Sequence, residues 1–211
     1  RGDLVLAQLP SSTSGRLTTA ADLTLSARQV FPATDTAFTV DATGRSITID
    51  QPAGDAPDLP WSAGGRLTLQ AARIVQGGRL RAPEGQLTLK ASEAVTLRAG
   101  SETSVNGGER SFLFGTWTGE RWQAPGSTTG FISAAPAKAV VLDAPRVTLE
   151  AGAQVDLSGG GRLLGWQFVA GPGGSTDIFS ATDGSYAIVP GVQSSGAADN
   201  SLPGLPAPGR Q

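Results

Sequence analysis

The chain has 211 residues, with 16 Lys and Arg against 18 Asp and Glu, and it contains no Cys, His or Met. These absences exclude Cys- and His-based nucleophiles, zinc sites of the usual ligand types and disulfide bonds. We expect no cofactor, no nucleic-acid partner and no membrane insertion, because the net charge is only −2 and no apolar run approaches the length of a spanning helix. The 29 Gly and 14 Pro favour an all-β protein with many turns.

The chain begins with Arg1, Gly2 and Asp3, which together match an integrin-type tripeptide. A three-residue match is frequent by chance, so a corner position for Asp3 is favoured over recognition. The first residues resemble neither a start Met nor a signal peptide, and we therefore expect a segment of a longer protein. Alternating apolar and polar residues then predict strands at 4–6, 23–25 and 38–40.

Internal repetition is the most informative feature of the next stretch. The phrase GRLTLQA at 65–71 recurs as GQLTLKA at 85–91, and a third alternating phrase, ITI at 47–49, lies upstream at the same spacing. A period of about 20, with about three brief strands between Gly and Pro corners, predicts a parallel β-helix. A sandwich of β-hairpins is the alternative, but Asp183-Gly184 is the only dipeptide typical of its tight turns.

A second repeat predicts where the chain leaves this solenoid. The phrase VTLRAG at 95–100 resembles VTLEAG at 147–152, and the chain between them is too long for a single coil. The stretch at 106–137 has the length of the surplus and lacks the alternating pattern, which predicts an extra-helical excursion. The β-helix segment then spans 1–192, with 162–192 as a candidate cap and 193–211 as a Pro/Gly/Ser-rich linker or tail.

Several phrases resemble filamentous-haemagglutinin-like large exoproteins of Gram-negative bacteria: ADLTLSA at 21–27, VLDAP at 141–145, AQVDLSGGG at 153–161 and FVAGPGGS at 168–175. The resemblance implies a right-handed parallel β-helix in a secreted fibrous adhesin at the bacterial cell surface. It also implies export of the parent protein through an outer-membrane transporter by two-partner secretion, and a role in attachment, aggregation or biofilm formation. The Asn-Pro-Asn motifs of the secretion domain are absent, so an interior shaft segment is expected.

The excursion carries the candidate binding residues, because five of the twelve aromatic residues fall within it beside arginines. Aromatic faces stack on sugar rings or partner side chains, and Arg supplies directional donors. The sequence TWTGERW at 116–122 predicts a tight turn between two short strands. An exopolysaccharide, a host-surface glycan or a protein is the expected partner, whereas a small core that anchors the excursion is the structural alternative. The candidate residues are Phe112, Phe114, Trp117, Arg121, Trp122 and Phe131.

Carboxylates are the remaining candidates for catalysis, and Asp143, Glu150 and Asp156 are expected to face solvent from separate strands. We therefore predict a non-enzymatic structural and adhesive segment. A glycan-binding module using the excursion is the alternative, and a polysaccharide-degrading enzyme on the same scaffold is less favoured. Trp61 and Trp166 are expected to cover coil edges. Unpaired strand edges at the ends of the β-helix predict either capping or end-to-end self-association.

Overall fold

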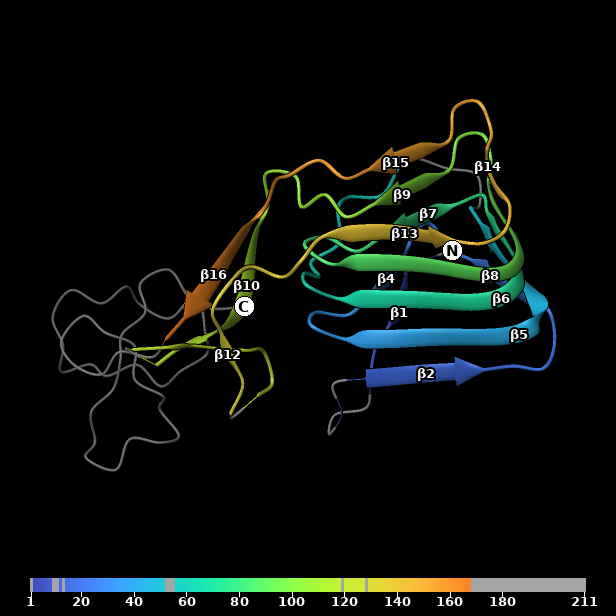
Figure 1. Ribbon diagram of the computed structural model, residues 1–211. Coiled ribbons are helices and arrows are strands. Elements are labelled where there is room, and N and C mark those ends of the chain that lie inside the picture. The colour runs from blue at the N-terminus through green and yellow to red at the C-terminus, as the bar shows by residue number, and fades with distance from the viewer. Residues whose placement is uncertain are drawn as a thin grey trace, which may run out of the picture. The chain divides into compact units, whose positions relative to one another are not determined.

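The structure is a computed structural model that describes residues 2–8, 12, 14–51, 56–118, 120–127 and 129–167. The described residues form β-strands and contain no helix, so the all-β prediction is confirmed. The strands make three sheets, and the pairings in the two larger sheets are parallel (Figure 1). The expected tail at 193–211, and all of the expected cap beyond residue 167, lie outside the described residues.

Sheet I has five strands in the order β1-β4-β7-β9-β15. Each strand is three residues long: β1 (Leu4–Leu6), β4 (Val30–Pro32), β7 (Arg79–Arg81), β9 (Glu102–Ser104) and β15 (Gln154–Asp156). Val30, Leu80 and Thr103 lie opposite one another on successive strands and are fully buried. One column of paired residues in this sheet therefore faces the core.

Sheet II follows the order β13-β8-β6-β5-β2, with β14 also paired to β8 and β3 to β5. Figure 1 shows β13, β8, β6, β5 and β2 side by side. The strands are β2 (Ser14–Thr18), β3 (Leu23–Ser26), β5 (Ala37–Asp50), β6 (Arg66–Gln76), β8 (Gln86–Leu97), β13 (Ala139–Asp143) and β14 (Val147–Leu149). We call sheets I and II together the stack.

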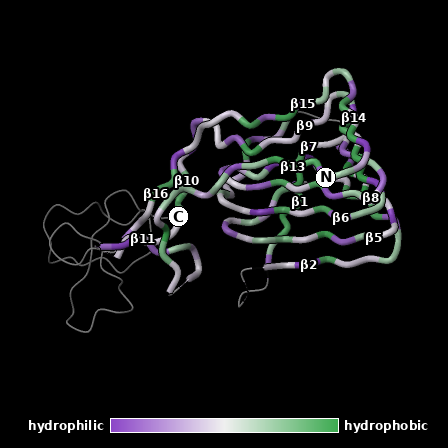
Figure 2. The backbone as a smooth tube through the Cα atoms, in the orientation of Figure 1, coloured by the Kyte–Doolittle hydropathy of each residue, from purple (hydrophilic) through white to green (hydrophobic). Residues whose placement is uncertain are grey.

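The two sheets of the stack share one apolar core. Buried and more exposed residues alternate along β5, β6 and β8, and hydrophobic and hydrophilic residues alternate with them (Figure 2). Val40, Leu69 and Leu89 lie directly opposite one another on these three strands and are fully buried. Burying one such Leu side chain contributes about 2 kcal/mol, and stacking like residues repeats that contribution on every strand.

Gln76 is a polar residue whose side chain lies inside this core. Gln76 occupies a position opposite Ile49 and Leu97 and is fully buried. Its Nε2 donates to the carbonyl oxygen of Glu102 (2.9 Å) and to Thr103 Oγ1 (3.3 Å), and its Oε1 accepts from the Gly78 N–H at 3.1 Å. Because its hydrogen-bonding groups are satisfied, Gln76 links sheet II to sheet I without an unpaired polar atom.

The strand register confirms two of the predicted repeats and corrects the third. Leu67 lies opposite Leu87, and Val95 lies opposite Val147, as the repeated phrases predict. Ile47 pairs with Ile74, however, while Phe38 is the residue opposite Leu67. The expected alignment of 47–49 with 67–69 was wrong, because the connection from β5 to β6 is longer than the one from β6 to β8 and changes the period.

The expected brief strands are partly fused. The stretch 66–76 forms the single strand β6 of 11 residues, although about three brief strands were expected in each period of about 20. The register of β6 against β8 shifts between Ala71 and Arg73, and β5 shifts against β6 between Ala42 and Ser46. A β-bulge bends a strand without ending its ladder, so a corner expected at these positions appears as an irregularity inside one strand.

Sheet III is formed mainly by the predicted excursion. Its order is β12-β11-β10-β16, with β10 (Ser111–Trp117), β11 (Trp122–Gln123), β12 (Phe131–Ile132) and β16 (Arg162–Trp166). Ala139 at the start of β13 lies opposite Gln86 of β8, so the chain between β9 and β13 does leave the stack. The predicted hairpin is confirmed by the antiparallel pairing of Trp117 with Trp122. β16, expected within a cap, instead pairs in parallel with β10.

Candidate functional site

The described part of the connection between β5 and β6 contributes no strand to sheet I. Residues 56–65, which are the larger described part of this connection, contain no strand, so β4 pairs directly with β7. The register of β4 and β7 joins a single pair, Val30 and Leu80. The loop at 56–61 lies beside this single pair, where its carbonyl groups accept hydrogen bonds from Gln29, which precedes β4, and from Arg81 of β7.

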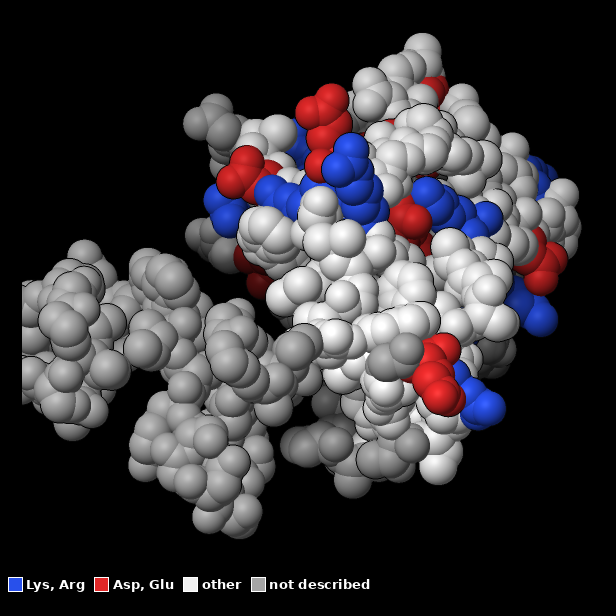
Figure 3. Space-filling view, turned by 90° about the vertical axis from the view of Figure 1, so that its left-hand side faces the viewer, with Lys and Arg blue, Asp and Glu red and all other residues white. Residues whose placement is uncertain are grey.

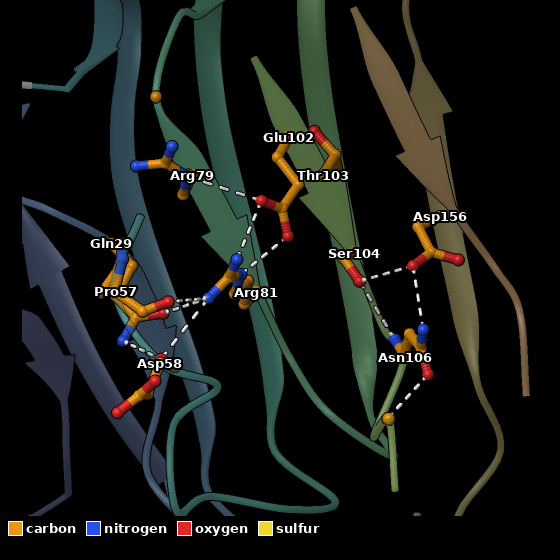
Figure 4. A network of polar contacts seen from close by, with 12 residues as sticks. Gln29, Pro57, Asp58, Arg79, Arg81, Glu102, Thr103, Ser104, Asn106 and Asp156 are labelled. Carbon is orange, nitrogen blue, oxygen red and sulfur yellow. Dashed lines mark hydrogen bonds and ion pairs between the residues drawn. The ribbon is translucent and has the colours of Figure 1, made fainter. Parts of the chain in front are cut away.

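Arg81 of β7 is the centre of a buried polar network at this place (Figure 4). Its Nε and Nη2 donate to the two carboxylate oxygens of Glu102 at 2.7 and 2.9 Å. Its Nη1 donates to Gln29 Oε1 (2.9 Å) and to the carbonyl oxygen of Pro57 (3.1 Å). Such a two-point contact between guanidinium and carboxylate fixes both side chains, because the planar groups match in geometry.

The same network holds the loop at 56–61 by its backbone. Gln29 is buried, and its Nε2 donates to the carbonyl oxygen of Asp58 (3.0 Å) and to Asp3 Oδ2 (2.8 Å). Arg110, which precedes β10, donates to the carbonyl oxygen of Leu59. Together with Pro57, three consecutive carbonyl groups thus accept hydrogen bonds from side chains that are distant in sequence. The loop therefore has a defined shape even though it is outside the strands.

A cleft of about 540 Å³ lies between this loop and the edge of sheet I. Trp61 stands on it with 76% of its surface exposed, and the Arg110 guanidinium lies 4.1 Å from the centre of its ring. The expectation that Trp61 covers a coil edge is therefore wrong. The residues that give the cleft its chemical character are Asp3, Arg28, Phe31, Asp58, Trp61 and Arg110.

This cleft was not predicted from the sequence, because its charged residues come from four separate stretches. Arg28 and Asp3 form an ion pair of 3.2 Å across one side. The integrin-type interpretation of Arg1, Gly2 and Asp3 loses support, since the Asp3 carboxylate is held by Arg28 and Gln29; Arg1 lies outside the described residues. The Trp that follows two prolines in the sequence PDLPW at 57–61 was the one local signal.

The predicted aromatic site in the excursion is only partly on the surface. Phe112 and Phe114 are buried at 3% and 2% exposure and form a small core with Ala63, which removes them from the candidate binding surface. Trp122 is half-buried against this core, and its indole N–H donates to the carbonyl oxygen of Phe114. These three residues serve as the anchor that the structural alternative predicted.

The other candidates remain exposed but do not share one surface. Trp117 is paired with Trp122, whereas Phe131 is paired with its neighbour Gln123. Successive residues of a strand point to opposite faces, so Trp117 and Phe131 lie on opposite faces of sheet III. Arg121 lies over the Phe131 ring at 5.0 Å. The expected aromatic residues therefore do not form a single platform.

Sheet III differs from the cleft in charge as well. Arg162 is the one charged residue within its four strands. Figure 3 looks onto the side where sheet III lies in Figure 1, and its charged side chains gather in the upper part while the lower part is largely uncharged. Large exposed apolar side chains include Leu113 and Leu164, which lie opposite each other on β10 and β16.

Polar side chains fix the connecting segments that lead from the stack to sheet III. The Asp156 carboxylate at the end of β15 accepts hydrogen bonds from Ser158, both from its N–H (2.9 Å) and from its hydroxyl. It also accepts a hydrogen bond from Asn106 Nδ2 at 3.0 Å, which Figure 4 shows. The two bonds from Ser158 are the main cause that lowers the pKa of Asp156, with smaller contributions from Asn106 and Ser104. Nearby, Lys138 Nζ lies 2.8 Å from the buried Glu84 carboxylate.

The carboxylates considered for catalysis have separate partners. Asp143 lies 3.9 Å from Lys90, and Glu150 accepts the Ala99 N–H at 3.0 Å. The Asp156 carboxylate accepts the hydrogen bonds from Ser158 and Asn106 described above. Among the described residues, no group of three or more acidic side chains is arranged to hold a metal ion, and no helix long and apolar enough to cross a membrane is found there.

The upper edge of the stack exposes residues that are core residues elsewhere. Val95 and Leu97 of β8 are fully buried, but Val147 and Leu149, which lie directly opposite on β14, are 39% and 54% exposed. At this edge the described residues provide no further strand beyond β13, β14 and β15. The core column therefore ends in an open apolar edge.

Searches of protein-family models, curated proteins and solved structures found no match to this chain.

Proposed function

We propose that this chain is a non-enzymatic shaft segment of a secreted, fibrous bacterial adhesin, built as a right-handed parallel β-helix with a period of about 20. The parallel pairing of Leu67 with Leu87, and of Val95 with Val147, supports this architecture. In a β-helix each coil packs only against its neighbours, so the helix can become longer without a thicker core. The resemblance to filamentous-haemagglutinin-like exoproteins supports a location at the bacterial surface, export through an outer-membrane transporter, and a role in attachment, aggregation or biofilm formation.

The observation that carries the proposal is the open edge at Val147 and Leu149. Their buried counterparts on β8, Val95 and Leu97, are covered by the next strand, β14. Among the described residues, no further strand covers Val147 and Leu149. Another coil placed on β13, β14 and β15 would bury both side chains and pair the free strand edge. The segment is therefore suited to continuation, either by more of a parent chain or by a second copy.

Sedimentation velocity over a range of concentrations tests this interpretation. We expect the wild-type chain to associate as concentration rises, and the double variant Val147→Lys, Leu149→Lys to remain monomeric. Val141→Lys is the matched control, since Val141 is also exposed (44%) on the same edge but alternates with the core-facing Val140 and Leu142. A wild-type chain that stays monomeric, or equal loss of association in the control, would contradict the proposal.

The adhesive part is tested separately with beads that carry the wild-type chain. We expect the beads to attach to bacterial or host cells more than beads coated with albumin. Absence of attachment would remove the adhesive role and leave the structural one. Release of reducing ends from exopolysaccharide would contradict the non-enzymatic assignment.

A glycan-binding module in the excursion is the second candidate function. The exposure of Trp117 (41%) and Phe131 (50%), with Arg121 over the Phe131 ring, favours it. Loss of exopolysaccharide binding in Trp117→Ala, with an unchanged circular dichroism spectrum, would support this candidate over a purely structural segment.

A further inference from the structure

We propose that the cleft beside Trp61 is a carbohydrate-binding site that accepts one neutral hexopyranose unit of a glycan. This site is separate from the aromatic residues of the excursion and goes beyond the proposed shaft function. Three features of the cleft support the assignment: an immobilised and exposed aromatic ring, an unpaired carboxylate, and a loop whose shape is fixed before any ligand arrives.

The Trp61 ring provides a stacking surface. With 76% of the residue exposed, its apolar area is not used in the core, although burial is the usual state of so large a side chain. Arg110 fixes the ring, because its guanidinium lies 4.1 Å from the ring centre while also donating to the carbonyl oxygen of Leu59. The exposed area that remains fits the apolar C–H face of a pyranose, which stacks on aromatic rings.

The hydrogen-bonding groups of the cleft favour a neutral sugar. Arg28 is paired with Asp3, and Arg110 is engaged with Leu59 and Trp61. Asp58 is exposed, and within the described residues its carboxylate has no hydrogen-bond or ion-pair partner. A carboxylate accepts hydrogen bonds from two adjacent sugar hydroxyls but repels a uronate or sulfate group. The acceptor capacity left over in the cleft is therefore suited to hydroxyls.

The loop that presents these groups is preorganised. Arg81 and Gln29 are buried polar residues that fix the carbonyl groups of Pro57 and Asp58. A rigid site loses less conformational entropy on binding, which raises affinity. A loop that served only to connect β5 with β6 would need the same hydrogen bonds. It would not need the Trp61 ring and the Asp58 carboxylate to be exposed to solvent.

Isothermal titration calorimetry with cellohexaose, maltohexaose and mannohexaose tests the site on the full chain. We expect at least one of these neutral oligosaccharides to bind, and Trp61→Ala to weaken that binding by about tenfold or more, as loss of an aromatic stack does. Asp58→Ala should weaken it about three- to tenfold through loss of charged acceptors. Leu113→Ala is the control, since Leu113 is 70% exposed on β10 of sheet III and belongs to neither candidate binding site, and its affinity should equal that of the wild type.

Four outcomes would overturn the site. These are no binding of any of the three neutral oligosaccharides, tighter binding of a galacturonate hexamer, unchanged affinity in Trp61→Ala, or equal loss in Leu113→Ala. Circular dichroism and the melting temperature verify that Trp61→Ala and Leu113→Ala fold, which is expected because both side chains are exposed. The sedimentation result at Val147 and Leu149 does not depend on this cleft, so the shaft proposal and the binding site fail independently.

Discussion

The stack and the loop at 56–61 are held in place by opposite kinds of interaction. In the stack, each fully buried side chain such as Leu69 contacts similar apolar residues above and below, and no single contact is specific. In the loop, side chains from distant parts of the sequence donate to individual carbonyl groups. The stack therefore tolerates imperfect repetition. The loop depends on a few polar side chains, because the loss of one leaves its buried hydrogen-bond partners unsatisfied.

The largest effect is expected from breaking an apolar column of the stack. Leu69→Ala removes a fully buried side chain between Val40 and Leu89 and should lower the free energy of unfolding by about 3 to 5 kcal/mol. Urea denaturation followed by circular dichroism measures this change. Val141→Ala is the control, because Val141 is 44% exposed on β13 and should change stability by about 0.5 kcal/mol or less.

The stack was predictable because its stabilising interactions repeat in the sequence. The phrases at 67–69 and 87–89 pair residue for residue, and so do those at 95–97 and 147–149. The prediction failed at 47–49, where a longer connection changed the spacing while the alternation stayed the same. Alternation identifies a strand, but it does not identify which neighbour the strand pairs with.

A smaller effect is expected from breaking the polar network of the loop. Arg81→Ala removes the donor to Gln29 and Pro57 and the closer of two arginine partners of Glu102, whose carboxylate keeps Arg79 at 3.6 Å. We expect the free energy of unfolding to fall by about 2 to 3 kcal/mol. The value lies below the range for fully buried pairs, because the Glu102 side chain keeps 23% of its surface exposed. Chemical denaturation measures it.

The control for Arg81→Ala is an ion pair whose side chains are exposed on the surface. Arg73→Ala breaks the pair with Glu93, whose side chains are 62% and 49% exposed, and should cost about 0.5 kcal/mol or less. Equal losses in the two variants would show that the Arg81 network contributes no more than an ordinary surface pair. The double variant Arg81→Met, Glu102→Met should recover only part of the stability, because it removes the Arg81–Glu102 pair as a whole but leaves Arg79, whose side chain is 17% exposed, without its carboxylate partner.

The cleft was not predictable from the sequence, and the reason is physical. Gln29 and Arg81 are far apart in the sequence, and their bonds with Pro57 and Asp58 follow no period. The aromatic residues of the excursion were visible in the sequence, but the strand pairing places Trp117 and Phe131 on different faces. The aromatic residues of the excursion cluster in the sequence but do not form one surface. The residues of the cleft beside Trp61 are far apart in the sequence but lie together in the structure.

The smallest effect concerns the junction between the stack and sheet III, where Asp156 binds Asn106 and Ser158. Because these bonds lower the pKa of Asp156 in the folded chain, its stabilisation is present above the unfolded pKa and is lost as the pH falls through the folded one. We expect Asp156→Asn to lose less stability than the wild type on acidification from about pH 5 to pH 3, by less than about 1 kcal/mol because water screens this site.

The pH dependence of stability must be compared between the wild type and Asp156→Asn, since Asp35 changes stability with pH in the opposite direction. Burial raises the pKa of Asp35 despite the nearby Arg66, so its protonation favours the folded chain as the pH falls. The wild-type curve contains both contributions, and subtracting the Asp156→Asn curve isolates one of them. A difference that stays constant between about pH 5 and pH 3 would show that the bonds to Asp156 do not distinguish its charged form. The junction would then depend on the apolar contacts of Phe112 and Phe114 with Ala63, and on Lys138 with Glu84.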